Sequence, residues 1–287
     1  MDVSLPRSLD EALEIKARRP DAVPIAGGTD LMVAVNFDRI RPACILDLTR
    51  VPELRQWRRE DGTFFLGAGV TYSRIVRELP EHVPLVQASR SVGSPQIRNR
   101  GTVGGNLGTA SPAGDALPPL AAYDAEVMLV RAGGRMRALR WDRFLTGPKR
   151  TALEPDELIL GVRWLLTRGP GSFSKIGPRN AMVIAVASLC LVMDEERRAL
   201  RVALGSVGPT ILRAPDAETF AARALDRAGV WDDSRAALAP GALEDFGERV
   251  AAAARPIDDI RGSAAYRRHG CNVLARRALA WALQGRH

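Results

Sequence analysis

Two short glycine-rich segments constrain the fold of this chain more than any other feature of its sequence. Residues 26–30 (AGGTD) follow a predicted short strand, and residues 101–106 (GTVGGN) follow a predicted loop. Consecutive glycines permit positive φ and let backbone N–H groups converge on an anion, and a threonine hydroxyl adds a further donor. A dinucleotide has two phosphates, so the pair predicts a dinucleotide clamp. Each segment taken alone is more typical of a plain tight turn, and it is the pair that favours a clamp.

Rival phosphate-binding loops and other site chemistry are absent from the sequence. It contains neither the P-loop pattern G-x-x-x-x-G-K-[ST] nor the Rossmann pattern G-x-G-x-x-G. The three cysteines and three histidines are scattered, without a C-x-x-C or H-E-x-x-H spacing, so we predict no metal site. Because no nucleophile with an adjacent base and no carboxylate pair emerges, we predict no catalytic residue for substrate chemistry.

Charge and hydropathy narrow the possible partners. The net charge is +8, but the basic residues are spread along the chain without a run of five or more, which argues against nucleic acid. A basic face could attract an acidic protein partner. No apolar run reaches the roughly 18 residues of a membrane span. The first residues do not resemble a secretory signal, and we expect a cytoplasmic protein.

The length of 287 residues predicts two domains. The segment Gly169-Pro170-Gly171 divides residues 1–168 from residues 172–287. In the first domain, a helix over residues 9–18 begins at the N-cap Ser8, and Gly133-Gly134 predicts a hairpin turn. In the second domain we predict three strands of a small antiparallel sheet (172–176, 183–193 and 199–207) and three helices (near 216–228, 243–254 and 263–283).

The region around the second glycine segment is predicted to be mostly loop. Residues 85–100 begin as a helix and end in a loop near Ser94-Pro95, which leads into the glycines. Helical pattern returns only from about residue 113 to residue 123.

The residues that follow the second glycine segment resemble a known family. Residues 104–115 (GGNLGTASPAGD) closely resemble the FAD signature of the xanthine dehydrogenase family of molybdenum hydroxylases. Three more blocks fit in order, namely residues 26–31 (AGGTDL), 67–71 (GAGVT) and 258–268 (DDIRGSAAYRR), so the resemblance covers nearly the whole chain. It implies an α+β fold, with a vanillyl-alcohol-oxidase-type (PCMH-like) FAD-binding domain of two α+β subdomains. A small α/β C-terminal domain, with a three-stranded antiparallel sheet and helices, would follow.

The resemblance also implies which residues hold FAD. The first glycine segment would hold the pyrophosphate, with Gly27, Gly28 and Thr29 nearest, and the second would hold its other side. The positions of Thr109, Ser111 and Asp115 are those that bind the ribityl chain and the adenosine part, where a carboxylate can accept two sugar hydroxyls. The whole predicted set is Ile25, Ala26, Gly27, Gly28, Thr29, Asp30, Leu31, Met32, Val92, Thr102, Val103, Gly104, Gly105, Asn106, Thr109, Ser111, Asp115, Leu158, Ile159 and Lys175.

Some members of this set have an equally ordinary explanation. Val92 and either Leu158 or Ile159 fall where the family places apolar contacts to the cofactor, but they are also typical core residues. Lys175 resembles a lysine that reaches the flavin, where a cation near the pyrimidine end stabilises the anionic reduced ring. The alternative for Lys175 is a surface lysine on a strand, and the alternative for Asp115 is an acid at a helix N-terminus.

The function implied by the resemblance is electron transfer in a heterotrimer. Substrate would be hydroxylated at a molybdopterin centre on a large subunit, electrons would pass through two [2Fe–2S] clusters on a small subunit, and FAD on this chain would deliver them to NAD, oxygen, a quinone or another acceptor. Two alternatives stay open: a stand-alone FAD oxidase of the same superfamily, and a non-catalytic FAD or nucleotide sensor. The block at residues 258–268 is interpreted as structural, a helix start with a docking surface.

Overall fold

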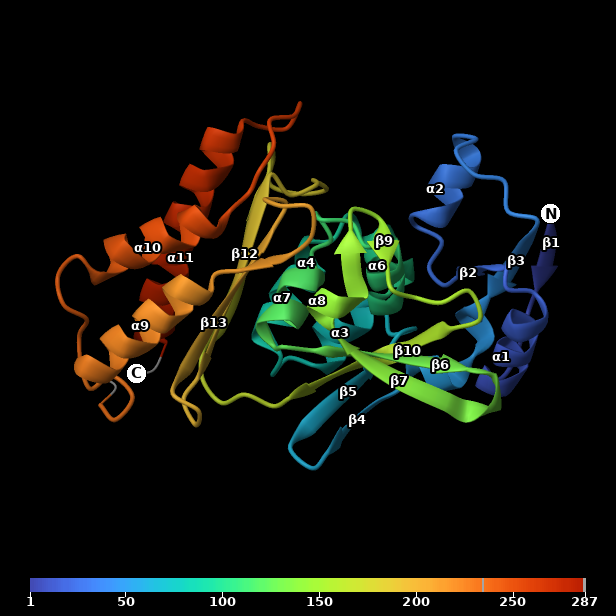
Figure 1. Cartoon of the computed structure of the whole chain (residues 1–287), viewed down its shortest axis with the longest axis horizontal. Coiled ribbons are helices and arrows are strands. Elements are labelled where there is room, and N and C mark those ends of the chain that lie inside the picture. The colour runs from blue at the N-terminus through green and yellow to red at the C-terminus, as the bar shows by residue number, and fades with distance from the viewer. Residues whose placement is uncertain (234, 286–287) are drawn as a thin grey trace. The chain divides into compact units, whose positions relative to one another are not determined.

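The computed structural model describes residues 1–233 and 235–285, which form two compact units that alternate along the sequence (Figure 1). Unit 1 comprises residues 1–79, 92–111 and 124–165, and unit 2 comprises residues 80–91, 112–123 and the described residues from 166 onward. Both glycine segments therefore belong to unit 1, whereas Asp115 and Lys175 belong to unit 2.

Unit 1 contains a three-stranded parallel sheet in the order β1 (Asp2–Ser4), β3 (Cys44–Asp47), β2 (Val23–Ile25). Helix α1 (Leu9–Arg18) begins as predicted at Ser8, whose hydroxyl accepts a hydrogen bond from the Glu11 amide at 3.2 Å. Ala12 and Leu13 of α1 pack with Leu46 of β3 and Val130 in one buried cluster. The glycine segment that follows β2 thus starts from the end of a half-buried strand that pairs with β3.

The larger sheet of unit 1 is antiparallel, in the order β4 (Trp57–Glu60), β5 (Thr63–Gly67), β10 (Leu158–Leu165), β6 (Glu126–Arg131), β7 (Arg135–Arg140). Gly133 and Gly134 both have positive φ in the turn between β6 and β7, so the predicted hairpin is confirmed. The remaining elements of unit 1 are α2 (Leu31–Asn36), α3 (Tyr72–Glu78), α5 (Pro95–Arg100), α6 (Val103–Thr109), α8 (Trp141–Phe144), the 3-10 turns Leu48–Arg50, Pro52–Arg55 and Ala132–Gly134, and the small hairpin β8 (Leu145–Gly147) with β9 (Arg150–Thr151).

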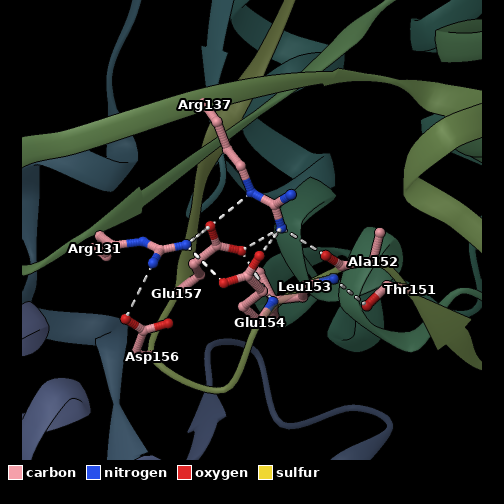
Figure 2. A network of polar contacts seen from close by, with 8 residues as sticks. All are labelled: Arg131, Arg137, Thr151, Ala152, Leu153, Glu154, Asp156 and Glu157. Carbon is pink, nitrogen blue, oxygen red and sulfur yellow. Dashed lines mark hydrogen bonds and ion pairs between the residues drawn. The ribbon is translucent and has the colours of Figure 1, made fainter.

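A buried carboxylate joins the β6–β7 hairpin to the segment that enters β10 (Figure 2). Glu157, 1% exposed, accepts from Arg137 through Nε at 2.7 Å and Nη2 at 2.8 Å, and from Arg131 Nη2 at 2.9 Å. The backbone amide of Glu154 also donates to Glu157, at 2.9 Å. Although burial raises it, these hydrogen bonds hold the pKa of Glu157 at about 2, below its ordinary value of 4.5. The network belongs to the fold of unit 1.

Replacing Glu157 by glutamine is expected to lower the free energy of unfolding near neutral pH by about 2 kcal/mol, because the partly exposed arginines lose a charged acceptor. Because the pKa of Glu157 is lower in the folded than in the unfolded chain, its ionised form stabilises the fold at pH values above the unfolded-state pKa. This stabilisation is lost as pH falls from about 4.5 through 2 and the carboxylate takes up a proton. The difference between wild type and Glu157→Gln, measured by urea denaturation, should therefore shrink over that range. A difference that stays constant down to pH 2 would contradict this assignment.

Unit 2 is built on an antiparallel sheet in the order β11 (Gly171–Ile176), β12 (Ala187–Asp194), β13 (Ala199–Gly205), β14 (Leu212–Arg213). Helices α9 (Pro215–Arg227), α10 (Ala242–Ala253) and α11 (Ala264–Gln284) lie on one side of the sheet, and α4 (Val83–Ser91) and α7 (Leu117–Ala122) lie on the other (Figure 1). Every residue of β12 is buried because both faces are covered, which explains its nearly continuous apolar sequence.

Several sequence-based boundaries are corrected by the structure. The sheet of unit 2 has four strands and not three, because the two-residue β14 is too short to leave a periodic signal. Residues 85–100 were predicted to begin as a helix and end in a loop, but the helix α4 is followed, after residues 92–94 with Gly93 at φ 43°, by a second helix, α5, where the loop was expected. The helix expected over residues 113–123 is confined to α7. Strands β1, β4, β8 and β9 were not predicted.

The second glycine segment is itself helical, where a loop was expected. Helix α6 begins at Val103 because the Thr102 hydroxyl accepts a hydrogen bond from the Gly105 amide at 3.0 Å and caps the helix. It ends at Thr109, and Ala110 follows in the left-handed conformation at φ 47°. The low helix propensity of three glycines had concealed this element.

Candidate cofactor site

The two glycine segments lie directly against each other within unit 1. A Cβ placed on Gly27 would lie 2.6 Å from the carbonyl carbon of Arg100 and 2.9 Å from the Cα of Gly101. Arg100 Nε donates to the Gly27 carbonyl at 3.4 Å, and the Thr109 hydroxyl donates to an Asp30 carboxylate oxygen at 3.3 Å. Glycine is therefore required at position 27 because another backbone occupies the space of a side chain.

Helix α6 has one packed side and one bare side. Val103 and Leu107 are buried, and a Cβ on Gly104 would lie 2.5 Å from the Cβ of Ala68. Gly105 and Gly108 are exposed; the nearest atom to an added Cβ would be the Thr102 hydroxyl at 3.2 Å for Gly105 and the Ile159 Cδ1 at 3.8 Å for Gly108. Packing thus explains the glycine at 104, while the glycines at 105 and 108 leave helix backbone open to a ligand.

The first glycine segment leads into a helix that buries none of its residues. Gly28 has φ 75°, a conformation that favours glycine, and a Cβ there would lie 3.3 Å from Ile25 and 3.4 Å from Met32. Asp30 precedes α2 without capping it through its side chain. Ala26 and Thr29 are half-buried in the same turn, and Leu31 is half-buried at the start of α2. Of the predicted residues 25–32, Asp30 is exposed and the others are half-buried.

Asn106, a predicted site residue on α6, is half-buried, and its side-chain amide oxygen lacks a hydrogen bond among the described residues. Within residues 1–233 and 235–285, its Oδ1 is buried and has no hydrogen-bond partner. A buried amide oxygen without a partner costs about 1–3 kcal/mol. A ligand with hydroxyl or N–H donors would remove that cost.

In unit 2, Lys175 and Asp115 form a buried ion pair. Lys175 Nζ lies 2.6 Å from Asp115 Oδ2, and it also donates to the carbonyls of Ser91 at 2.9 Å and Val183 at 3.1 Å. The side chains are 10% and 8% exposed. An ammonium group has three donors, so all three protons of Lys175 are directed at protein acceptors.

The carboxylate of Asp115 is satisfied on one oxygen. Its Oδ2 accepts from Lys175 and from the Ser91 hydroxyl at 3.1 Å, whereas its buried Oδ1 has no partner in the described part of the chain. Burial raises the pKa of Asp115, and the charge and hydrogen bonds of Lys175 partly offset that rise. Oδ1 is thus a buried acceptor without a hydrogen-bond donor in the described part of the chain.

The structure separates the remaining predicted residues. Leu158 is 1% exposed within the core cluster of unit 1, whereas the half-buried Ile159 lies beside the bare side of α6. Val92 is half-buried in unit 1, and its carbonyl accepts from Arg98 at 3.1 Å. Ser111 is half-buried and ends the unit 1 segment. Ser91 was missed by sequence reasoning, because its link to Lys175 spans 84 positions and leaves no local signal.

Each unit, taken by itself, offers groups to which a ligand with phosphates or hydroxyls could bind. Backbone is open at Gly105 and Gly108, and unsatisfied acceptors are present at Asn106 in unit 1 and at Asp115 in unit 2. Among the described residues there is no cluster of three or more potential metal-ligating side chains, and no helix is long and apolar enough to cross a membrane. The fold is therefore α+β, and helix α6 of unit 1 presents exposed glycine backbone.

Comparisons with known proteins agree over both parts of the chain. The family model described as the FAD binding domain in molybdopterin dehydrogenase matches residues 1–164, and the CO dehydrogenase flavoprotein C-terminal domain matches residues 172–282. The nicotine 6-hydroxylase medium subunit of Paenarthrobacter nicotinovorans is 31% identical over 285 residues, which cover 96% of this chain and 94% of the relative.

Two further matches extend the comparison. The nicotinate dehydrogenase FAD-subunit of Eubacterium barkeri is 36% identical over 193 residues, covering 63% of this chain and 64% of the relative. The solved carbon monoxide dehydrogenase of Hydrogenophaga pseudoflava, in a form lacking the Mo-pyranopterin moiety of the molybdenum cofactor, matches with a TM-score of 0.85 and 26% identity over 100% of this chain and 98% of that one. The chain belongs to the family of FAD-binding medium subunits of molybdenum hydroxylases. It is an oxidoreductase subunit, and FAD is its own cofactor.

Proposed function

We propose that this chain carries electrons from [2Fe–2S] clusters of a small partner subunit, through FAD, to a final acceptor. A large molybdopterin-binding subunit would oxidise the substrate, so the chain needs no catalytic residue for substrate chemistry. Bound FAD supplies the ability to take electrons singly and to give them singly or as a hydride. A cytoplasmic location, a heterotrimeric assembly, a PCMH-type FAD domain over residues 1–168 and a C-terminal domain over residues 172–287 are parts of this proposal.

The chain's own residues bind and orient the cofactor in this proposal. The backbone of residues 25–32 and 102–106 would bind phosphate oxygens, and Asn106 and Asp115 would accept hydrogen bonds from hydroxyl or N–H groups. Four more residues remain proposed contacts to FAD: Val92, Thr109, Ser111 and Ile159. The side chain of Leu158, by contrast, is buried in the hydrophobic core of unit 1. Lys175 would act by fixing the carboxylate of Asp115, since its three donors already have protein acceptors.

The bare side of α6 is the observation that carries the proposal, and an absorption spectrum of the purified chain tests it. We expect the two bands of oxidised flavin and, after release, about one FAD per chain. The test is repeated after mixing with partner subunits. A colourless protein that takes up no FAD in either form would remove the flavoprotein assignment.

Replacing Gly108 by alanine should separate binding from folding. A Cβ there makes only an ordinary contact with Ile159, so the FAD-free chain should unfold at the same or a higher temperature; alanine in a helix interior is favoured by about 0.5–1 kcal/mol. FAD affinity should fall about 10-fold or more, because a methyl group would separate the ligand from the helix backbone. Titration of the FAD-free chain measures this. An unchanged affinity would mean that FAD does not contact this side of α6.

A further inference from the structure

A cavity of about 340 Å³ lies in unit 2, where helix α9 begins and helix α10 ends. Its lining consists of three arginines (Arg213, Arg249 and Arg255), Asp216, and otherwise only alanine and proline. Small-molecule sites have volumes of about 300–1,000 Å³, so the cavity lies at the lower end of that range. None of its residues belongs to the proposed FAD set, and its basic lining has no role in the function proposed above.

Arg213 is a fixed part of the lining whose charge is already compensated. Its Nε and Nη2 donate to the two carboxylate oxygens of Glu218 at 2.6 and 2.7 Å, and its Nη1 donates to the carbonyl of Ala121 at 3.1 Å. The same Glu218 accepts from the backbone amide of Val202 at 2.9 Å. Arg213 therefore shapes the cavity but contributes little attraction for an anion.

Arg249 is positioned by a ring and has its hydrogen-bond donors available. Its guanidinium carbon lies 4.7 Å from the centroid of the Phe220 ring, and within the described residues none of its N–H groups has an acceptor. Stacking on a ring face uses the flat side of the guanidinium group and leaves its N–H edge free. A side chain held in this way loses less conformational freedom when a ligand binds.

Arg255 is held at the same end of α10 and retains donors as well. Its Nη1 donates to the carbonyls of Ala252 at 2.6 Å and Ala254 at 3.2 Å, whereas Nε and Nη2 find no acceptor in the part of the chain that the structure describes. Asp216 is the one carboxylate of the lining. Once Glu218 is set against Arg213, two arginines face one aspartate, and the cavity has one positive charge in excess.

We propose that this cavity binds a phosphate group, free or as part of a small molecule, through the donors of Arg249 and Arg255. The planar guanidinium fork matches the spacing of phosphate oxygens and can bind two of them at once. A phosphate group has three strong acceptor oxygens, enough for two guanidinium groups, whereas a carboxylate has only two oxygens. The alanines and Pro215 of the lining would contact the rest of a larger ligand.

Calorimetric titration of the FAD-saturated chain with inorganic phosphate and with adenosine monophosphate tests the cavity. Bound FAD keeps both probes away from the glycine segments, and a constant ionic strength removes general screening. Both probes should bind saturably, and Arg249→Gln should weaken both about 10-fold, because it removes a charge-assisted donor pair. Tighter binding of the nucleotide would identify a phosphate group on a larger molecule, and equal binding would identify free phosphate.

Two further variants separate a defined site from general attraction by basic residues. Arg223→Gln is the matched control, because Arg223 is exposed on α9 outside the lining, and it should leave both affinities unchanged. Asp216→Asn should tighten binding about 2- to 3-fold, since it removes a like charge from the lining. Arg249 is exposed, so Arg249→Gln should fold normally.

Wild-type affinity in Arg249→Gln, or no saturable binding of either probe to the wild-type chain, would overturn the inference. So would an equal loss of affinity in Arg223→Gln, because binding would then follow net charge and not the cavity. A chain that takes up no FAD would end the proposed electron-transfer function. The difference between wild type and Arg249→Gln would still decide the cavity in that case, because all of its lining belongs to unit 2.

Discussion

Replacement of Lys175 by methionine is expected to lower the free energy of unfolding by about 3–5 kcal/mol at neutral pH, because it leaves the buried carboxylate of Asp115 without its counter-charge. The pair is 10% and 8% exposed, so water cannot screen the remaining charge. The carbonyls of Ser91 and Val183 would lose their donor as well. Urea denaturation of the FAD-free chain measures the effect.

The pH dependence of this variant identifies the cause. Burial already raises the pKa of Asp115, and loss of Lys175 should raise it further. A carboxyl group whose folded-state pKa is raised destabilises the fold above its unfolded pKa, and stability returns as pH falls through the folded-state value and the group takes up a proton. The penalty of Lys175→Met should therefore shrink between pH 7 and pH 4. This direction is opposite to that expected for Glu157, whose pKa is lowered.

A double-mutant cycle provides the control. Asp115→Asn alone should be milder than Lys175→Met, because Lys175 would keep two carbonyl acceptors. The double variant should be more stable than the sum of the two single effects, since neither charge remains unpaired. Strictly additive effects would show that the two side chains do not stabilise each other. FAD affinity should fall in Asp115→Asn even where stability is preserved, if Oδ1 accepts a hydrogen bond from the cofactor.

Local signals predicted a large part of the fold. Ser8 marked the start of α1, the glycine pair at residues 133–134 marked the hairpin, and the apolar run over residues 183–193 marked the strand β12. Each depends on residues within a few positions of one another, where propensity and periodicity act. The two-residue β14 and the glycine-rich α6 were missed because the first is too short for periodicity and the second is decided by a cap and by packing on Ala68.

The candidate site was predictable in its residue types but not in their roles. Residue patterns and resemblance pointed to the glycine segments, Asp115 and Lys175. They could not show that the Lys175 ammonium donates its three hydrogen bonds to acceptors 8, 60 and 84 positions away in the sequence. Nor could they show which glycines allow close packing against other residues and which leave the helix backbone exposed. Those distinctions depend on contacts between distant segments, which one sequence does not encode in any local pattern.

Gly27→Ala should therefore have the largest effect among alanine substitutions in the glycine segments. The added Cβ would clash with backbone atoms only, namely the Arg100 carbonyl and the Gly101 Cα. Backbone atoms cannot relieve a clash by a change of rotamer, as a flexible side chain can. Overpacking of this kind costs about 1–3 kcal/mol or more, and relief would require the two glycine segments to separate. We expect a lower unfolding temperature for the FAD-free chain and loss of FAD binding together.

Gly108→Ala is the contrasting control, because the same chemical change later in helix α6 brings the added Cβ only into ordinary contact with Ile159 Cδ1, at 3.8 Å. If the two segments act as one clamp, Gly27→Ala should abolish FAD binding because it disrupts the fold around the segments. Gly108→Ala should weaken FAD binding while the fold stays intact. Thermal denaturation and FAD titration of both variants distinguish these causes. A Gly27→Ala chain with wild-type stability would show that the contact between the two segments is not tight. Loss of stability with retained FAD affinity would show instead that the cofactor does not need both segments in contact, and the clamp would have to be abandoned.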